Sequence, residues 1–327
     1  MRDEKVIQVI IPTYNSARDL DATMESIRKQ NYIPERICVT IVDFGSSDGT
    51  YEKALGYNWK NLGVYTRPFQ KRWRSRISDI ARMLGIADYN MYQYYFIVLY
   101  PGDVMYPNCC SMLSYKFKEN YRLNPEMVFC ESDIFDSNGN IEKQKPLFSH
   151  DCVIDGEKDI CEYIKRGYKH QIFSMTQSFY MARDVECYER NEGRCWNKLV
   201  HRNCGKMAVY IEKPLVCTKR IIYEDELEEI LHIWENFLAL EQCTKWNMDK
   251  NFIPYASENL SEYALWRSFC LYQSGTDEKA MQDCFMISRV ISPGIEEREI
   301  YQKMKQLVLE GDIQQEKIVE QYFREQN

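Results

Sequence analysis

Two short apolar stretches of this sequence end in side chains that could bind a nucleotide. Residues 9–12 are apolar and residues 37–42 are apolar except for Thr40. The polar groups that follow them are Thr13, Tyr14, Asn15, Asp43, Ser46 and Ser47. The ring of Tyr14 can stack on a base, and the carboxylate of Asp43 can accept the ring N–H of uracil. The sequence therefore predicts a nucleotide pocket at the ends of these two stretches.

Parallel β-strands must position these side chains. Each stretch is short, apolar and bounded by polar residues, as buried strands are. About thirty residues separate the two ends, which is the length of one strand–helix–strand unit. Strands joined in this way lie parallel, so their carboxyl ends meet at the edge of the sheet where α/β proteins bind ligands. We expect Tyr14 and Asp43 to lie together at that edge.

A basic helix is predicted after the third strand. Residues 67–82 hold six basic residues and one acid, and Phe69 begins the apolar stripe that this helix would bury. Lys71 and Arg74 are expected on a solvated face, as charged helix faces usually are. Arg82 lies near the helix end, where its guanidinium could bind diphosphate oxygens.

Asp103 follows the predicted fourth strand, residues 94–100, in a Pro-Gly-Asp turn. Aspartate is an ordinary turn residue. The alternative is a carboxylate that faces a ribose hydroxyl or a divalent cation. Its place at the same sheet edge as Asp43 favours this functional interpretation.

These stretches together resemble the family 2 glycosyltransferases. The resemblance is carried by residues 9–15, 42–50, 81–86 and 99–103 with Pro107, and by a weaker echo in 204–216. It covers residues 5–110 well, and four pieces in the right order and spacing are specific. The resemblance implies the GT-A fold, in which a nucleotide-binding α/β half is joined to an acceptor-binding half.

The resemblance also implies roles for individual residues. The predicted nucleotide-binding residues are Pro12, Thr13, Tyr14, Asn15, Asp43, Gly45, Ser46 and Arg82, and Asp103 is the predicted metal-loop residue. The family usually has several acids in this loop, whereas residues 100–102 contain none. One carboxylate alone is a poor ligand set for Mg²⁺ or Mn²⁺. A divalent cation is therefore a candidate cofactor, and metal dependence stays open.

Transfer with inversion needs a base that takes the proton of the acceptor hydroxyl. The family supplies an acid shortly before a Trp-containing helix, and the matching stretch here is residues 191–199. Glu192 is the candidate base, with Asp103 as the second catalytic candidate, although a loop glutamate is more often only solvated. Glu224 and Asp225 come after the closing strand and are better explained as acids at a helix N-terminus.

The order of elements predicts an α/β fold with a mixed sheet flanked by helices and a helical C-terminal extension. Strands are expected at 6–12, 37–42, 62–66, 94–100, 127–133, 173–181 and 207–211, with a cap at Asn15 or Ser16 starting the first helix. A hairpin turn is expected at 137–140. Helical stripes follow from residue 224, including 261–274, 278–290 and 295–310. We therefore divide the chain into residues 1–223, the GT-A domain, and 224–327, the helical extension.

Composition limits the partners and the compartment. The net charge of −7 argues against nucleic-acid binding. The 13 cysteines show no Cys-x-x-Cys, and no signal peptide precedes the first strand, which together indicate a reducing cytoplasm. No apolar stretch is long enough to span a membrane, so any membrane contact would be peripheral. The helical extension could pack on its own domain or form a homodimer.

The prediction from sequence is an inverting glycosyltransferase that uses a nucleotide-sugar, in particular a UDP-sugar. The acceptor would be a saccharide or a lipid-linked molecule, in surface polysaccharide or glycoconjugate synthesis. The alternative is a catalytically silent member of the fold that binds nucleotides or serves as a scaffold. The four histidines have no metal-binding spacing, and neither a Walker loop nor Gly-x-Gly-x-x-Gly is present, so hydrolase, NTPase and dehydrogenase functions have little support.

Overall fold

The structure is a computed structural model with two compact units. It describes residues 5–69, 94–123, 125, 127–130, 132–135, 139–143, 146, 148–155, 177–181, 207–219, 227, 230, 231, 234, 252–275 and 277–325. One unit comprises Met1–Glu157 and Phe173–Ile221, and the other comprises Lys158–Ile172 and Ile222–Asn327. The division at residue 223 made from the sequence stays a prediction.

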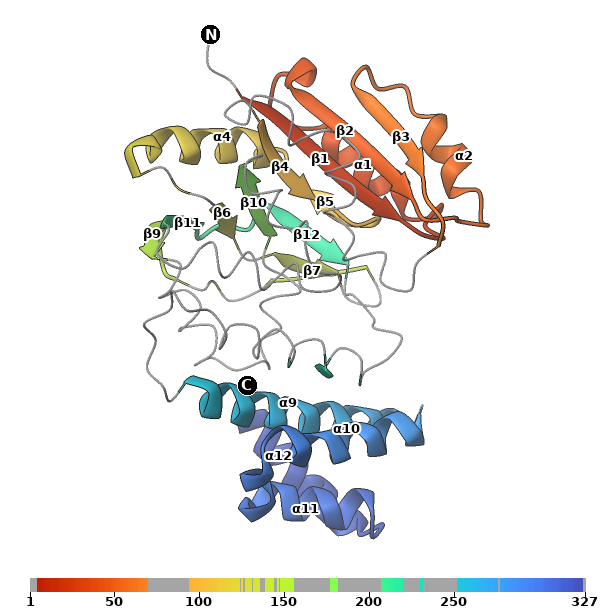
Figure 1. The fold of residues 1–327 in the computed structure, drawn as a ribbon, viewed down its shortest axis with the longest axis vertical. Helices are drawn as coiled ribbons and strands as arrows, with labels where there is room; N and C mark the ends of the chain where they lie inside the picture. The colour runs from red at the N-terminus through yellow and green to blue at the C-terminus, as the bar shows by residue number, and fades with distance from the viewer. Residues whose placement is uncertain are drawn as a thin grey trace. The chain divides into compact units, whose positions relative to one another are not determined.

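Four parallel strands form the part of the first unit that carries the predicted nucleotide site. They are β1 (Val6–Thr13), β2 (Ile37–Asp43), β3 (Leu62–Thr66) and β4 (Tyr94–Val98), and they lie side by side in the order β3-β2-β1-β4. Their arrowheads point in one direction in Figure 1. The predicted parallel arrangement is confirmed, because Thr13 pairs with Asp43 at the carboxyl ends of β1 and β2.

The sheet continues beyond β4 with mixed directions. The further strands are β10 (Gln177–Met181), β6 (Met127–Cys130), β11 (Met207–Ile211) and β9 (Cys152–Asp155), in that order. Strand β10 runs antiparallel to both of its neighbours, and β11 runs parallel to β6. Among the described residues this sheet has eight strands, and their directions confirm the mixed sheet predicted from the sequence.

A second, smaller sheet follows the predicted metal loop. It consists of β5 (Val104–Met105), β12 (Val216–Lys219), β7 (Asp133–Phe135) and β8 (Ile141–Glu142). Strands β7 and β8 form the hairpin expected around residues 137–140. The expectation of one strand at 127–133 is wrong, because the chain leaves the large sheet after Cys130 and Asp133 pairs with Cys217 of β12.

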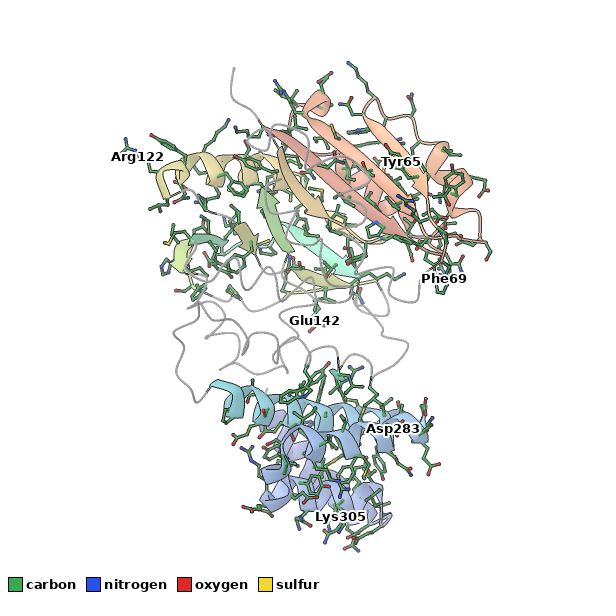
Figure 2. The ribbon with its side chains drawn as sticks, viewed as in Figure 1. Tyr65, Phe69, Arg122, Glu142, Asp283 and Lys305 are labelled. Atoms are coloured by element: carbon green, nitrogen blue, oxygen red, sulfur yellow. The ribbon has the colours of Figure 1, made fainter. Side chains whose placement is uncertain are left out.

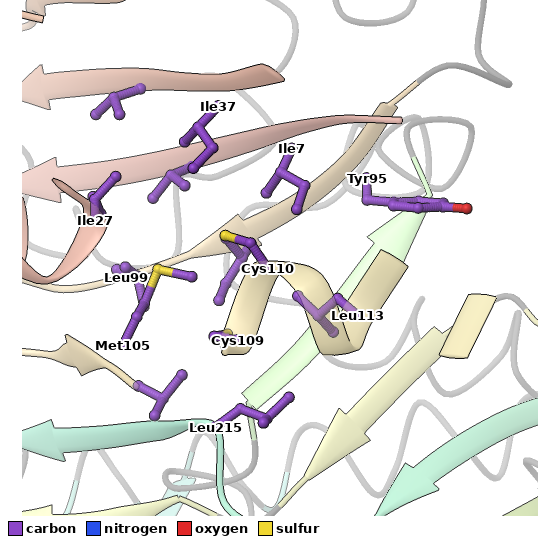
Figure 3. Packing of buried hydrophobic residues seen from close by; sticks show 14 of the residues in the cluster. Ile7, Ile27, Ile37, Tyr95, Leu99, Met105, Cys109, Cys110, Leu113 and Leu215 are labelled. Atoms are coloured by element: carbon purple, nitrogen blue, oxygen red, sulfur yellow. The ribbon is translucent and has the colours of Figure 1, made fainter. Parts of the chain in front are cut away.

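Alternate residues of the parallel strands form one face of the hydrophobic core. Ile7, Val9 and Ile11 of β1 are fully buried in it. Helix α1 (Leu20–Arg28) contributes Leu20, Met24 and Ile27 to this cluster, and α4 (Cys109–Glu119) contributes Cys109, Cys110, Leu113 and Phe117. Figure 3 shows Cys109, Cys110 and Leu113 of α4 packed among strand residues. The same unit also contains η1 (Pro34–Arg36), α2 (Thr50–Leu55) and η3 (Tyr121–Leu123).

Helix α1 begins later than the sequence suggested. A cap at Asn15 or Ser16 is wrong, because Asp19 is the N-cap residue and Leu20 is the first helical residue. The intervening N–H groups bind the neighbouring loop instead, since Ser16 N donates to Thr50 Oγ1 and Ala17 N donates to Asp48 Oδ2. The loop after β1 is therefore longer than predicted.

The described part of the second unit is helical and has its own core. Its elements are α9 (Phe252–Ser274), α10 (Glu278–Ile291), η6 (Pro293–Glu297), α11 (Glu299–Val308), η7 (Ile313–Gln315) and α12 (Glu316–Glu325). Phe285 and Met304 are fully buried, together with Leu265, Tyr301 and Phe323. The helices predicted at 261–274 and 278–290 are confirmed, whereas the helix predicted at 295–310 is shorter, because residues 293–297 form η6 and α11 begins only at Glu299. No described helix is long and apolar enough to cross a membrane.

Candidate nucleotide site

The carboxylate of Asp43 organises the two strand ends. Its side chain is 1% exposed, and Thr13 beside it is fully buried. The Thr13 hydroxyl donates to Asp43 Oδ1 at 3.1 Å, Ser46 N donates to Oδ2 at 2.9 Å, and the Ser46 hydroxyl also donates to Oδ1. A carboxylate has about four acceptor positions, so these three bonds occupy all but one, and the remaining position at Oδ2 is buried with the rest of the side chain.

Further hydrogen bonds join the loop after β1 to the loop after β2. Asn15 N donates to Ser46 Oγ at 2.8 Å, and Ser47 N donates to Asn15 Oδ1 at 2.9 Å. Asn15 has a φ of +45°, a left-handed conformation that asparagine tolerates better than most residues. Because each loop satisfies polar groups of the other, the two loops form one structure at the edge of the sheet.

An aromatic pair lies beside this structure. The ring centroids of Tyr14 and Phe69 are 4.5 Å apart, and the rings are inclined by 37°. Phe69 is 53% exposed, and Figure 2 shows it near the arrowheads of β1 and β2. Its expected place in a buried helical stripe is therefore wrong. The missed signal was its position just after Thr66, the last residue of β3, at the same edge of the sheet.

Gly45 lies beside this aromatic pair in a left-handed backbone conformation. Its φ is +75°, which favours glycine, and a Cβ added there would lie 3.4 Å from Phe69 N. Pro12 is buried within β1 and aligns with Val42. The structure thus brings together the predicted residues Pro12, Thr13, Tyr14, Asn15, Asp43, Gly45 and Ser46.

Asp103 lies in the turn between β4 and β5 and is 2% exposed. Its Oδ2 accepts from Tyr100 N at 2.9 Å, and its Oδ1 accepts from Lys219 N at 3.1 Å. Burial raises the pKa of this carboxyl to about 7, although both backbone hydrogen bonds act in the opposite direction. In this geometry Asp103 links the turn to β12.

The described residues do not fit a divalent-cation site at this turn. Mg²⁺ and Mn²⁺ take oxygen ligands from accessible carboxylates, phosphates and water. The carboxylate of Asp103 is enclosed, and both of its oxygens accept main-chain N–H groups. Within the described ranges, no three His, Cys, Asp or Glu side chains form a group that could hold a metal ion.

Two predicted residues, Arg82 and Glu192, lie outside the described residues, as do Lys71, Arg74, Glu224 and Asp225. Their roles stay predictions. A described cation that contacts the metal-loop turn is Lys219, whose backbone N–H binds Asp103 and whose side chain lies near Gly102. Sequence reasoning missed Lys219, because nothing in the stretch around it marks its contact with a turn more than a hundred residues earlier.

Both the sequence and the fold of this chain have relatives among known proteins. Residues 8–121 match the family model described as "Glycosyl transferase family 2". This match confirms the family predicted from the sequence and places it on the part of the chain that contains the loops described above. No curated protein matches the chain in a sequence search.

Solved structures of TarS from S. aureus share the fold. The structure of TarS residues 1–349 has a TM-score of 0.58 and 12% identity, with 98% of this chain and 92% of that chain covered. The structure of its complex with UDP-GlcNAc has a TM-score of 0.60 and 13% identity, and the same shares of the two chains are covered. A longer TarS structure has a TM-score of 0.58 and 12% identity, with 97% of this chain and 55% of that chain covered. At this identity the likeness establishes the fold, which is GT-A.

Proposed function

We propose that this protein is a glycosyltransferase that takes its sugar from a nucleoside-diphosphate sugar, in particular a UDP-sugar. The family match and the fold support the class of enzyme. The observation that best supports nucleotide binding is the Tyr14–Phe69 pair beside the carboxylate of Asp43, at the carboxyl ends of parallel strands. The TarS structures include complexes with UDP and with UDP-GlcNAc, which supports uridine as the nucleoside.

The proposed pocket combines stacking with one polar contact. Tyr14 and the exposed Phe69 offer ring faces to a base, and base–aromatic stacking contributes about 1–3 kcal/mol per base. Asp43 Oδ2 keeps one acceptor position for the ring N–H of uracil, while its other bonds fix the carboxylate in place. Asp43 therefore both shapes the loop and provides the acceptor.

The proposed reaction proceeds with inversion at the anomeric carbon. The acceptor oxygen forms a bond to that carbon as the bond to the diphosphate oxygen breaks, and a base takes the proton of the acceptor hydroxyl. Glu192 is the proposed base and Arg82 a proposed ligand of the diphosphate. Charge grows on the departing diphosphate, so cations near it stabilise the transition state more than the ground state.

The acceptor and the cellular setting belong to the same proposal. A saccharide or lipid-linked acceptor in surface polysaccharide or glycoconjugate synthesis fits the family resemblance, and a cytoplasmic enzyme with peripheral membrane contact fits a lipid-linked acceptor. The helical unit has exposed apolar residues on α10, Met286 at 40% and Val290 at 69%, where a homodimer contact is a further proposal.

Titration calorimetry with UDP and with uridine tests the nucleotide site. Phe69→Ala should weaken both ligands by about 5- to 100-fold, since a stacking contact is lost. Tyr65→Ala is the matched control, because this exposed aromatic residue lies within β3 and not in the loop after it. Equal affinities for wild type and Phe69→Ala would refute the pocket.

Release of UDP from UDP-GlcNAc in the presence of an acceptor tests the enzyme. The alternative is a member of the fold without catalytic activity. One observation favours it: the carboxylate of Asp103, in the predicted metal loop, is enclosed. UDP binding without turnover of several UDP-sugars would favour that alternative. Turnover that is lost in Glu192→Gln, with UDP affinity retained, would support the proposed base.

A further inference from the structure

Lys219 places a cation at the turn after β4. It is the last residue of β12, and its N–H donates to Asp103 Oδ1 at 3.1 Å. Its ammonium group lies 2.6 Å from Asp19 Oδ2, at the start of α1, and its side chain is 54% exposed. The backbone of Lys219 is thus fixed to one loop of the edge, while its charged end is held at another and remains accessible to solvent.

Gly102 makes room for this side chain. Its φ is +97°, a conformation that favours glycine, and its N–H donates to Thr23 Oγ1 at 2.9 Å. A Cβ at this position would lie only 3.0 Å from Lys219 Cδ. The aliphatic part of Lys219 therefore lies directly over the glycine, so the turn itself determines the path of the lysine.

The strand order indicates where a diphosphate would lie. The proposed base site is at the ends of β2 and β1, and β4 is the next strand on the other side of β1. Beyond β4 the sheet continues into the half of the fold that binds the acceptor in GT-A proteins. A donor with its base at Asp43 and its sugar toward that half must carry its phosphates past the loops of β1 and β4. Asp19 and Gly102 are in these loops.

We propose that Lys219 binds the diphosphate of the donor and supplies the positive charge that a divalent cation would otherwise provide. This inference rests on the proposed function. It follows from two findings at one turn: the enclosed carboxylate of Asp103 does not fit a metal ligand, and the exposed side chain of Lys219 lies over Gly102 of this turn with its ammonium group at Asp19. Lysine is a common phosphate ligand because its ammonium group is a compact charge with three donors.

Calorimetry with two ligands, UDP and uridine, isolates the contact with phosphate. Lys219→Met should weaken UDP by about 10- to 100-fold, the contribution of a charge-assisted hydrogen bond, and leave uridine unchanged. Lys219→Arg should retain most of the UDP affinity. Lys213→Met is the matched control, because this exposed lysine lies before β12, at its opposite end. Binding of UDP to the wild type should be equal in EDTA and in Mn²⁺.

The variant should fold, because an exposed ion pair such as Lys219–Asp19 contributes little to stability. Asp19→Asn removes the competing partner of the ammonium group and should leave UDP affinity equal or higher. The inference is overturned if Lys219→Met binds UDP like Lys213→Met, if UDP binding requires Mn²⁺, or if the loss appears instead in Arg18→Met or Arg67→Met. Absence of uridine and UDP binding in the wild type would refute the proposed function instead.

Discussion

At the scale of single residues, two buried carboxylates are kept in place by backbone N–H groups and hydroxyls. Asp43 accepts from Thr13 and Ser46, and Asp103 accepts from Tyr100 N and Lys219 N. Burying a carboxylate is unfavourable unless hydrogen bonds replace water. Each of these aspartates therefore fixes a loop of the sheet edge, whichever ligand the edge binds.

Replacing Asp43 by alanine should reduce both stability and nucleotide affinity. The change leaves the Ser46 N–H without its acceptor and the Thr13 hydroxyl with only a long contact to Val42 O, so the free energy of unfolding should fall by about 2–4 kcal/mol. Urea unfolding measures this loss, and calorimetry measures the weaker UDP binding. Ser47→Ala, an exposed change in the same loop, should alter stability by less than about 0.5 kcal/mol. Unchanged UDP affinity in Asp43→Ala would show that the pocket is assigned wrongly.

Asp103 should make the free energy of unfolding fall as the pH rises from about 4 to about 7. Its pKa is about 7 in the folded protein against an ordinary 3.8, so between these values the folded chain retains a proton that the unfolded chain releases. Raising the pH from about 4 to about 7 therefore favours unfolding, by up to about 1.4 kcal/mol per pH unit from this group. Above pH 7 the folded protein no longer has the stabilisation that protonated Asp103 provides at lower pH.

Asp103→Asn removes this titration. The variant's unfolding free energy, measured by urea titration at several pH values, should fall less steeply between pH 4 and pH 7 than that of the wild type. Glu297→Gln, which removes an exposed carboxylate, should keep the wild-type slope. Parallel slopes for wild type and Asp103→Asn would contradict the shifted pKa.

At the scale of elements, local pattern predicted helices and parallel strands well but not long-range pairing. β2 and β3 follow from short apolar runs, and α10 follows from its apolar stripe. The split between β6 and β7 did not follow, because the strand predicted at 127–133 ran through the polar residues 131–133, and nothing in this stretch reveals that β6 pairs with β11 and β7 with β12. The partners are about eighty residues away, where pattern carries no information.

The same limit applies to the candidate site. Tyr14 and Asp43 could be predicted as neighbours, since their strands are adjacent in the chain. Phe69 was missed although it follows the end of β3, and Lys219 could not be predicted because its contact depends on which strand closes the small sheet. Residues that act from strand ends are thus easier to predict than residues that reach the site from loops and later strands.

Helix α10 offers a clean test of a local signal. Asp277 is its N-cap, and its Oδ1 accepts from Ala280 N at 2.9 Å. Asp277→Ala should lower the free energy of unfolding of the helical unit by about 1 kcal/mol, and Asp277→Ser should recover most of it. Lys279→Ala, an exposed change in the first turn, is the control. An equal loss in Asp277→Ser and Asp277→Ala would rule out capping as the cause.

At the scale of the whole molecule, the two units have separate cores. The core of the first is built from sheet residues with α1 and α4, and the core of the second from α9 to α12. Proteins with separate cores often unfold in more than one step, so a single unfolding temperature would not describe this chain. A substitution or ligand that affects one unit should therefore change the unfolding transition of that unit alone.

Calorimetric unfolding should therefore show two transitions that can be moved independently. UDP at a concentration 100 times its Kd should stabilise the first unit by about 2.7 kcal/mol and leave the second unchanged. Phe285→Ala removes a fully buried ring from α10, so it should lower the stability of the second unit by about 3–5 kcal/mol without changing UDP affinity. Lys279→Ala, at an exposed position of the same helix, is the control. One transition that shifts with both UDP and Phe285→Ala would show that the two cores unfold together, and that the helical unit stabilises the domain that binds the donor.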